Sequence, residues 1–139
     1  MCRATWADQW FEDLESCVLP ILNKDRKDRQ RPIRVAILDT GIDVAHPTFQ
    51  KAVLQNKIRA SRGFPETLEP FADGHGHGTH GGSVLLRIAP NAVLYIARIA
   101  DDEGHISTDN QYEGITKVVQ MSFQNVLIAG DILGYRKSS

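Results

Sequence analysis

Hydrophobic and polar positions along the chain predict a helix, a linker and then a set of buried strands. Residues 7–19 place apolar side chains three to four positions apart, which predicts a short amphipathic helix that ends near Pro20. The charges of residues 23–31 alternate in sign and indicate a solvated linker. From Pro32 onward, short apolar runs predict strands separated by segments with helical spacing.

The region after Pro32 predicts an α/β fold. Apolar runs with few interruptions are the candidate strands, at residues 33–38, 58–64, 92–97 and 118–123. Segments with helical spacing lie between them, at residues 47–54, 83–88 and 107–119. Strands that alternate with helices predict a mainly parallel sheet. Functional side chains gather at the carboxyl ends of such strands, so these ends are where we expect a site.

Composition and charge exclude several classes of protein. The 139 residues carry 16 basic and 17 acidic side chains, a formal net charge of −1, which argues against a nucleic-acid binder. A hydrophobic content of 42% argues against disorder. No apolar run reaches the ~18 residues of a membrane span. The acidic residues near the N-terminus argue against a signal peptide. We therefore expect an intracellular, cytoplasmic protein that contacts no membrane.

Candidate chemistry concentrates in two motifs. Asp39-Thr40-Gly41 directly follows the apolar run 33–38, so its carboxylate is expected at the end of a strand. Asp73-Gly-His-Gly-His-Gly-Thr-His80 places three histidines within six positions, beside glycines that allow close backbone packing. Each motif also has a purely structural interpretation, a strand-end turn for the first and an exposed loop for the second.

Three enzyme classes use such residues. His75, His77 and His80 are possible zinc ligands, because imidazole suits Zn²⁺ and three ligands leave a catalytic position open. Asp39 is a possible half of an aspartic-peptidase dyad, which would leave the histidines without a role. An Asp–His–Ser triad uses both motifs, because a buried carboxylate orients an imidazole that acts as general base. The 38 positions between Asp39 and His77 allow the chain to return to the same sheet edge.

Three blocks resemble the subtilisin-like serine peptidases (subtilases), in the order of that family. They are an aspartate block, a histidine block and the strand segment that follows, at residues 35–47, 73–80 and 89–98. The resemblance covers roughly residues 32–123. It implies a three-layer α/β fold with a mainly parallel sheet, subtilisin-like but truncated, and an activity in peptide-bond hydrolysis. It also implies that Asp39 is the triad aspartate and that His77 is the triad histidine.

The same resemblance implies a substrate-binding strand. Met121, Ser122 and Phe123 resemble the family's cleft strand, which pairs with the backbone of a peptide or protein substrate. The short segment before Ala89 lacks the calcium-binding loop of many secreted members. We therefore expect no metal and no cofactor.

The family's nucleophile block, Gly-Thr-Ser-x-Ala-Pro, has no counterpart in these residues. Only 62 residues follow His77, and no Gly-Thr-Ser occurs among them. A general base without a nucleophile forms no acyl-enzyme, so we expect a truncated peptidase domain that is inactive alone. A non-catalytic pseudo-peptidase or peptide-binding module remains an alternative.

These expectations divide the chain into three parts. Residues 1–31 form an N-terminal helix and charged linker, residues 32–124 a partial peptidase domain, and residues 125–139 a divergent tail. A parallel sheet cut short would leave an open apolar edge. We therefore expect a partner, or a missing C-terminal half, to cover that edge.

Overall fold

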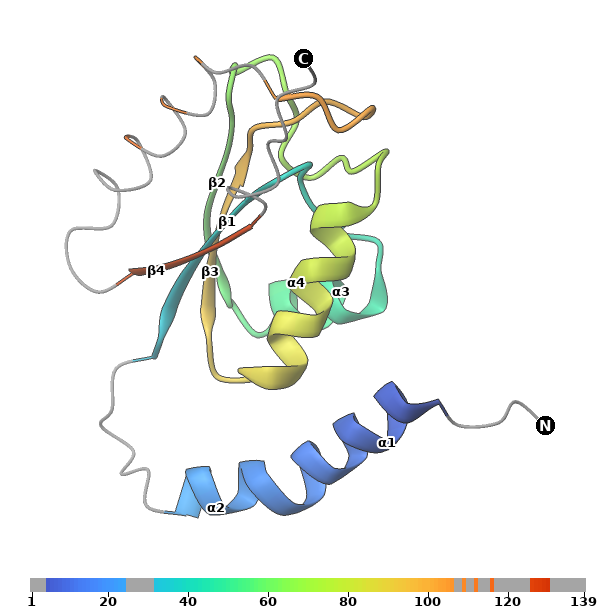
Figure 1. The fold of residues 1–139 in the computed structure, drawn as a ribbon. Helices are drawn as coiled ribbons and strands as arrows, with labels where there is room; N and C mark the ends of the chain where they lie inside the picture. Colours follow the sequence, from blue (N-terminus) through green and yellow to red (C-terminus); the bar gives the residue numbers. More distant parts are fainter. Residues whose placement is uncertain are drawn as a thin grey trace.

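A computed structural model describes residues 5–24, 32–106, 109, 112, 116 and 126–130. The helices are α1 (Trp6–Asp13), the π-helical η1 (Leu14–Val18), α2 (Leu19–Lys24), α3 (Pro47–Leu54) and α4 (His77–Ile88). The strands are β1 (Arg34–Asp39), β2 (Ile58–Gly63), β3 (Val93–Arg98) and β4 (Val126–Gly130). Figure 1 shows the strands side by side, with α3 and α4 together on one side of them.

The four strands form one parallel sheet in the order β2-β3-β1-β4, which confirms the predicted α/β fold. β1 is central, and its last residue, Asp39, is level with Arg98 at the end of β3. Five of the six residues of β1 are buried, as expected for a parallel strand covered on both faces. The carboxyl end of β1 therefore lies near the middle of the edge formed by the strand ends.

Side chains alternate from β1 and β3 into two buried clusters, one on each face of the sheet. The first cluster joins Val35, Ile37, Leu94 and Ile96 to Phe49 and Ala52 of α3 and Leu86 of α4. The second cluster contains Ala36, Leu38, Phe64, Ala97 and Ile99. Burial on both faces makes the sheet the rigid support from which the loops at its edge extend.

The helix α4 begins earlier than the sequence predicts. Its expected range was 83–88, yet it starts at His77, within the glycine-rich motif. Glycine is a poor helix former, so the motif favours a loop on propensity alone. Packing nevertheless favours glycine inside this helix, because a Cβ at Gly82 would lie 2.7 Å from the Phe49 ring. The close packing of α4 on α3 therefore requires a helical glycine at this position.

The N-terminal segment is also helical for longer than predicted. α1, η1 and α2 continue from Trp6 to Lys24, so Pro20 does not end the helix. The first turn has a capping box, in which Thr5 and Asp8 accept each other's backbone N–H groups. The wider π-helical turn of η1 ends at Val18, two positions before Pro20, whose ring and missing N–H the helix must accommodate.

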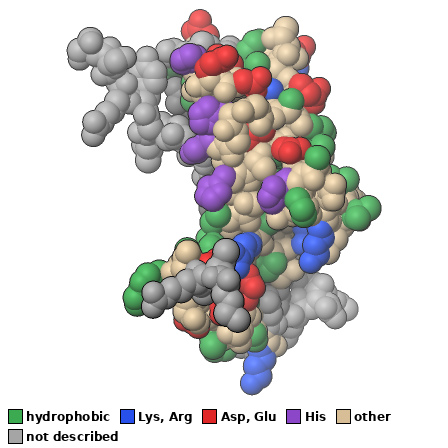
Figure 2. All heavy atoms as spheres, turned by 90° about the vertical axis from the view of Figure 1, so that its right-hand side faces the viewer, with side chains coloured by type: hydrophobic (Ala, Val, Ile, Leu, Met, Phe, Trp, Pro, Cys, Tyr) green, Lys and Arg blue, Asp and Glu red, His purple; other side chains and the backbone are tan. Residues whose placement is uncertain are grey.

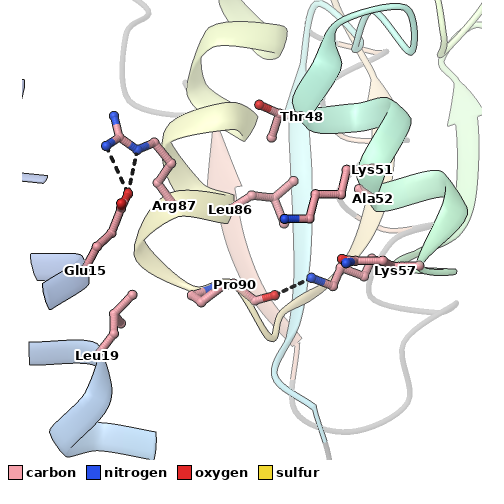
Figure 3. A pocket seen from close by; sticks show the side chains of 10 residues that line it. Glu15, Leu19, Thr48, Lys51, Ala52, Lys57, Leu86, Arg87 and Pro90 are labelled. Carbon is pink, nitrogen blue, oxygen red and sulfur yellow. Dashed lines mark hydrogen bonds and ion pairs between the residues drawn. The ribbon is translucent and has the colours of Figure 1, made fainter. Parts of the chain in front are cut away.

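Contacts to Arg87 of α4 join this helical arm (residues 5–24) to the rest of the molecule. Nε and Nη2 of Arg87 lie 3.0 Å and 2.9 Å from Oε1 of Glu15, and its guanidinium carbon lies 3.7 Å from the centre of the Phe11 ring. Figure 3 shows the ion pair beside a pocket of about 360 Å³ between the arm and α3 and α4. Because these side chains are partly exposed, each contact contributes about 1 kcal/mol at most.

The C-terminal region differs in part from the expectation. Residues 126–130, within the predicted divergent tail, form β4 and pair with β1. The strand predicted at 118–123 lies outside the described residues, and so does most of the helix predicted at 107–119. None of the described helices has the length and hydrophobicity that crossing a lipid bilayer requires.

Candidate active site

The fold brings Asp39 and His77 into contact across 38 positions of sequence. Asp39 is the last residue of β1, and His77 is the first residue of α4. Nδ1 of His77 lies 2.8 Å from Oδ1 and 2.9 Å from Oδ2 of Asp39. An ionised carboxylate only accepts hydrogen bonds, so Nδ1 must carry the hydrogen. The imidazole is thereby oriented with Nε2 as its second, basic nitrogen when the ring is neutral.

The two side chains differ in burial. The Asp39 side chain is 6% exposed, whereas that of His77 is 51% exposed. Asp39 is further held in place because its Oδ1 accepts the backbone N–H of Thr40 at 2.7 Å. A buried, fixed carboxylate behind a half-exposed imidazole is an arrangement suited to proton transfer at the molecular surface.

Two glycines allow this close approach. A Cβ at Gly78 would lie 2.1 Å from the carbonyl oxygen of Gly41. Gly41 itself has φ +103°, a backbone conformation that residues with a side chain rarely adopt. The first turn of α4 can therefore rest directly on the backbone that follows β1.

Three polar residues of the two motifs have a role at the site that the residue pattern does not reveal. The hydroxyl groups of Thr40, directly after β1, and of Thr79, in the first turn of α4, both donate to the carboxylate of Asp73. Their position in the sequence is consistent with such a role, because Thr40 adjoins Asp39 and the other two lie in the histidine motif. Their partners, however, are decided by which loops meet at the sheet edge.

The three histidines do not gather into the zinc site that is one of the alternative interpretations of the sequence. Figure 2 shows several histidine side chains along one face of the molecule. Among the described residues, the group of three potential metal ligands whose atoms all lie within 4.8 Å of one another consists of Asp101, Glu103 and His105, not of His75, His77 and His80. His77 instead directs Nδ1 to Asp39, and the ring centre of His75 lies 6.2 Å from that of His77.

The surroundings of Asp39 do not match an aspartic-peptidase site. The hydrogen-bond partners found for the Asp39 side chain within the described residues are Thr40 and His77, and neither is the second carboxylate that an aspartic peptidase needs. Met121, Ser122 and Phe123, the predicted substrate-binding residues, lie outside the described residues. The geometry therefore favours the Asp–His interpretation over the other two.

Replacing Asp39 with asparagine is expected to change the tautomer of His77. The amide presents an N–H₂ donor to the same ring nitrogen and one acceptor in place of two, so Nδ1 becomes the better acceptor and the hydrogen moves to Nε2. Imidazole ¹⁵N shifts in the labelled chain distinguish the two tautomers. His75→Asn is the matched control, because it removes a neighbouring imidazole and leaves the Asp39 contact intact. Unchanged His77 shifts in Asp39→Asn would contradict the assigned contact.

Comparison with known proteins supports the same interpretation. The model of the subtilase family matches residues 30–134. Subtilisin E of Bacillus subtilis (strain 168) is 30% identical over 103 residues, 67% of this chain and 24% of that protein. An intracellular serine protease of Paenibacillus polymyxa is 31% identical over 103 residues, 66% of this chain and 31% of that protein. A cuticle-degrading serine protease of Arthrobotrys oligospora is 29% identical over 109 residues, 76% of this chain and 26% of that protein.

The extent of these matches has two consequences. The chain spans about a quarter to a third of the length of the relatives it matches. The matched range includes both motifs and extends through β4, beyond the limit of 124 expected for the peptidase part. Because the family match covers most of the chain and the two motifs meet in space as its site chemistry requires, this chain belongs to the subtilase family.

Proposed function

We propose that this chain contributes the aspartate and the histidine of a serine-peptidase site. The observation that supports the proposal is the contact of Nδ1 of His77 with both oxygens of the buried Asp39, at 2.8 Å and 2.9 Å. The names of its relatives, subtilisins and serine proteases, agree with a serine-peptidase-like chemistry.

Each residue has a defined task in this proposal. Nε2 of His77 removes the proton of a serine hydroxyl as that oxygen attacks the carbonyl carbon of a peptide bond. The same proton then passes from His77 to the leaving amine. Asp39 keeps the ring in the required tautomer and stabilises the imidazolium formed in between. The peptide or protein substrate would be positioned by backbone pairing, for which Met121, Ser122 and Phe123 are the proposed residues.

The serine nucleophile is the component that these 139 residues do not supply. They contain no Gly-Thr-Ser, the sequence that marks the nucleophile in the resembled family. Without a nucleophile His77 has no hydroxyl to deprotonate, and no acyl-enzyme forms. We therefore propose that this chain, tested alone, hydrolyses no peptide, and that a serine from a further segment or another chain would complete the site.

A fluorogenic peptide assay tests the inactive state. The purified chain is expected to give no turnover above that of the His77→Ala variant. Turnover that His77→Ala abolishes would show a complete site and contradict the proposal. Peptide binding without turnover, with an affinity that Asp39→Ala does not change, would favour the peptide-binding alternative.

A fusion tests the two residues in a complete domain. The chain is joined to the C-terminal part of the subtilisin E domain that lies beyond the matched region. Peptidase activity is expected to appear in the fusion, to be lost in His77→Ala and to be strongly reduced in Asp39→Asn. His75→Ala is the control expected to retain activity. A folded, active fusion that is indifferent to His77→Ala would overturn the assignment.

A further inference from the structure

Asp73 forms a hydrogen-bonded bridge between the two segments that carry the candidate pair. Its Oδ1 accepts the Thr40 hydroxyl at 2.7 Å and the Gly76 N–H at 2.8 Å. Its Oδ2 accepts the Thr79 N–H at 2.8 Å and the Thr79 hydroxyl at 2.5 Å. The four donors come from both sides of the site, one from the residue after Asp39 and three from the start of α4.

The two threonines extend this bridge in opposite directions. While donating to Asp73, Oγ1 of Thr40 accepts the N–H of Gly78, the residue after His77, at 3.0 Å. Oγ1 of Thr79 likewise accepts the N–H of Asp43, in the loop after β1, at 2.9 Å. Each hydroxyl has one proton, and that proton goes to Asp73. The whole pattern therefore requires an acceptor with no proton of its own.

The electrostatics of Asp73 agree with that requirement. Partial burial favours the neutral acid and raises the pKa of Asp73. The hydrogen bonds from Thr79, Thr40 and Gly76 act against burial and together outweigh it, so the pKa lies below its ordinary value of 3.8. Asp73 is thus ionised at neutral pH and can accept all four hydrogen bonds.

A capping role alone does not account for the bridge. The N-cap residue of α4 is Gly76, whose lack of a side chain leaves the first turn without a side-chain cap of its own. Asp73 supplies that cap through the N–H groups of Gly76 and Thr79. The bond from Thr40 is different, because it ties the cap to the strand end that holds Asp39.

We propose that Asp73 is a positioning residue that sets the distance and orientation between Asp39 and His77 by linking Thr40 to the first turn of α4. The inference rests on the proposed function of the pair but concerns a residue that touches neither of its side chains. Loss of the link lets α4 shift relative to β1, so the Nδ1 contact with Asp39 is made less often.

The test measures the tautomer of His77 by imidazole ¹⁵N shifts in the labelled, unfused chain. Asp73→Asn is expected to lower the ratio of the Nδ1–H to the Nε2–H tautomer about fivefold, the equilibrium equivalent of one hydrogen bond of ordinary net strength. Thr40→Val is expected to act in the same direction, and Thr40→Ser, which keeps the hydroxyl, is expected to restore the ratio.

The matched control is Asp101→Asn. Asp101 is also a loop carboxylate that accepts backbone N–H groups, from Glu103 at 3.1 Å and His105 at 2.7 Å, but its hydrogen bonds stay within its own loop. It is expected to leave the His77 shifts unchanged. If Asp73→Asn lowers the melting temperature but leaves the tautomer ratio unchanged, Asp73 acts only as a helix cap and the proposal is overturned.

Asp39→Asn in the same spectra separates the two proposals. A change at His77 in Asp39→Asn but not in Asp73→Asn overturns only the positioning role. No change in Asp39→Asn overturns the proposed Asp–His pair itself. Should Asp73→Asn fail to fold, the comparison of Thr40→Val with Thr40→Ser decides the question, and equal tautomer ratios in these two variants overturn the proposal.

Discussion

Replacing Gly78 with alanine is expected to lower the free energy of unfolding by about 3 kcal/mol, the upper part of the usual cost of adding a methyl group to a packed interior. The new Cβ would lie 2.1 Å from the carbonyl oxygen of Gly41 and 3.2 Å from the Cβ of Asp39. The first obstacle is backbone and cannot rotate away, so α4 must move off the end of β1. Urea denaturation followed by circular dichroism measures the change.

Gly81→Ala is the control for this prediction. Gly81 lies in the same helix, and nothing is found within 4 Å of a Cβ built there. Since alanine is the better helix former, this substitution is expected to raise the free energy of unfolding by about 0.5–1 kcal/mol. Changes of opposite sign in the free energy of unfolding would show that steric contact, and not helix propensity, determines the effect of a glycine-to-alanine substitution in α4. Equal effects would contradict the close approach of α4 to β1.

The second large effect is expected at Arg98, whose substitution by methionine removes a buried guanidinium. Arg98 ends β3 and is 4% exposed. Its three nitrogens donate to the carbonyl oxygens of Glu69, Ala72 and Ala100 and to the carboxylate of Asp102, at 2.7–3.1 Å. Methionine fills similar space but donates to none of them. We expect the free energy of unfolding to fall by about 3 kcal/mol, because these buried hydrogen bonds from the guanidinium are lost together.

The control is Arg62→Met, at a half-exposed arginine of β2 paired with the exposed Glu66. Exposed ion pairs contribute about 1 kcal/mol or less, so little change is expected. Thermal and urea denaturation of both variants give the comparison. If Arg98→Met lowers the free energy of unfolding no more than Arg62→Met does, the hydrogen bonds to Glu69 and Ala72 contribute little to stability. Those bonds anchor the segment that leads into the histidine motif, so the Arg98 variant also reports on the support of the site.

Much of the site could be predicted from sequence because its chemistry is local. The carboxylate at the end of an apolar run and the histidines among glycines were visible as Asp39-Thr40-Gly41 and residues 73–80. The spacing of the two motifs allows Asp39 and His77 to reach the same sheet edge, and the resemblance to the subtilases implies that they form a pair. The structure confirms the contact at 2.8 Å and 2.9 Å.

Other features could not be predicted because their local preferences are overruled. Glycines favour a loop before residue 83, yet α4 starts at His77, where Gly78 and Gly82 permit close packing. Proline favours a helix end at Pro20, yet the helical arm continues through α2 after a π-helical turn. In both places the sequence pattern reflects the local helix propensity. Where the helix actually begins or ends depends on packing against neighbouring elements or on an irregular turn.

The sequence by itself determined the alternation of strands and helices, the two motifs and their order, since these follow from the spacing of apolar residues and from residue type. Only the tertiary structure decided that Asp73 joins Thr40 to Thr79 and that Arg98 anchors the loop beside them. A carboxylate or a guanidinium can bond to many partners, and which partner it finds depends on segments far apart in sequence that only the folded sheet edge brings together.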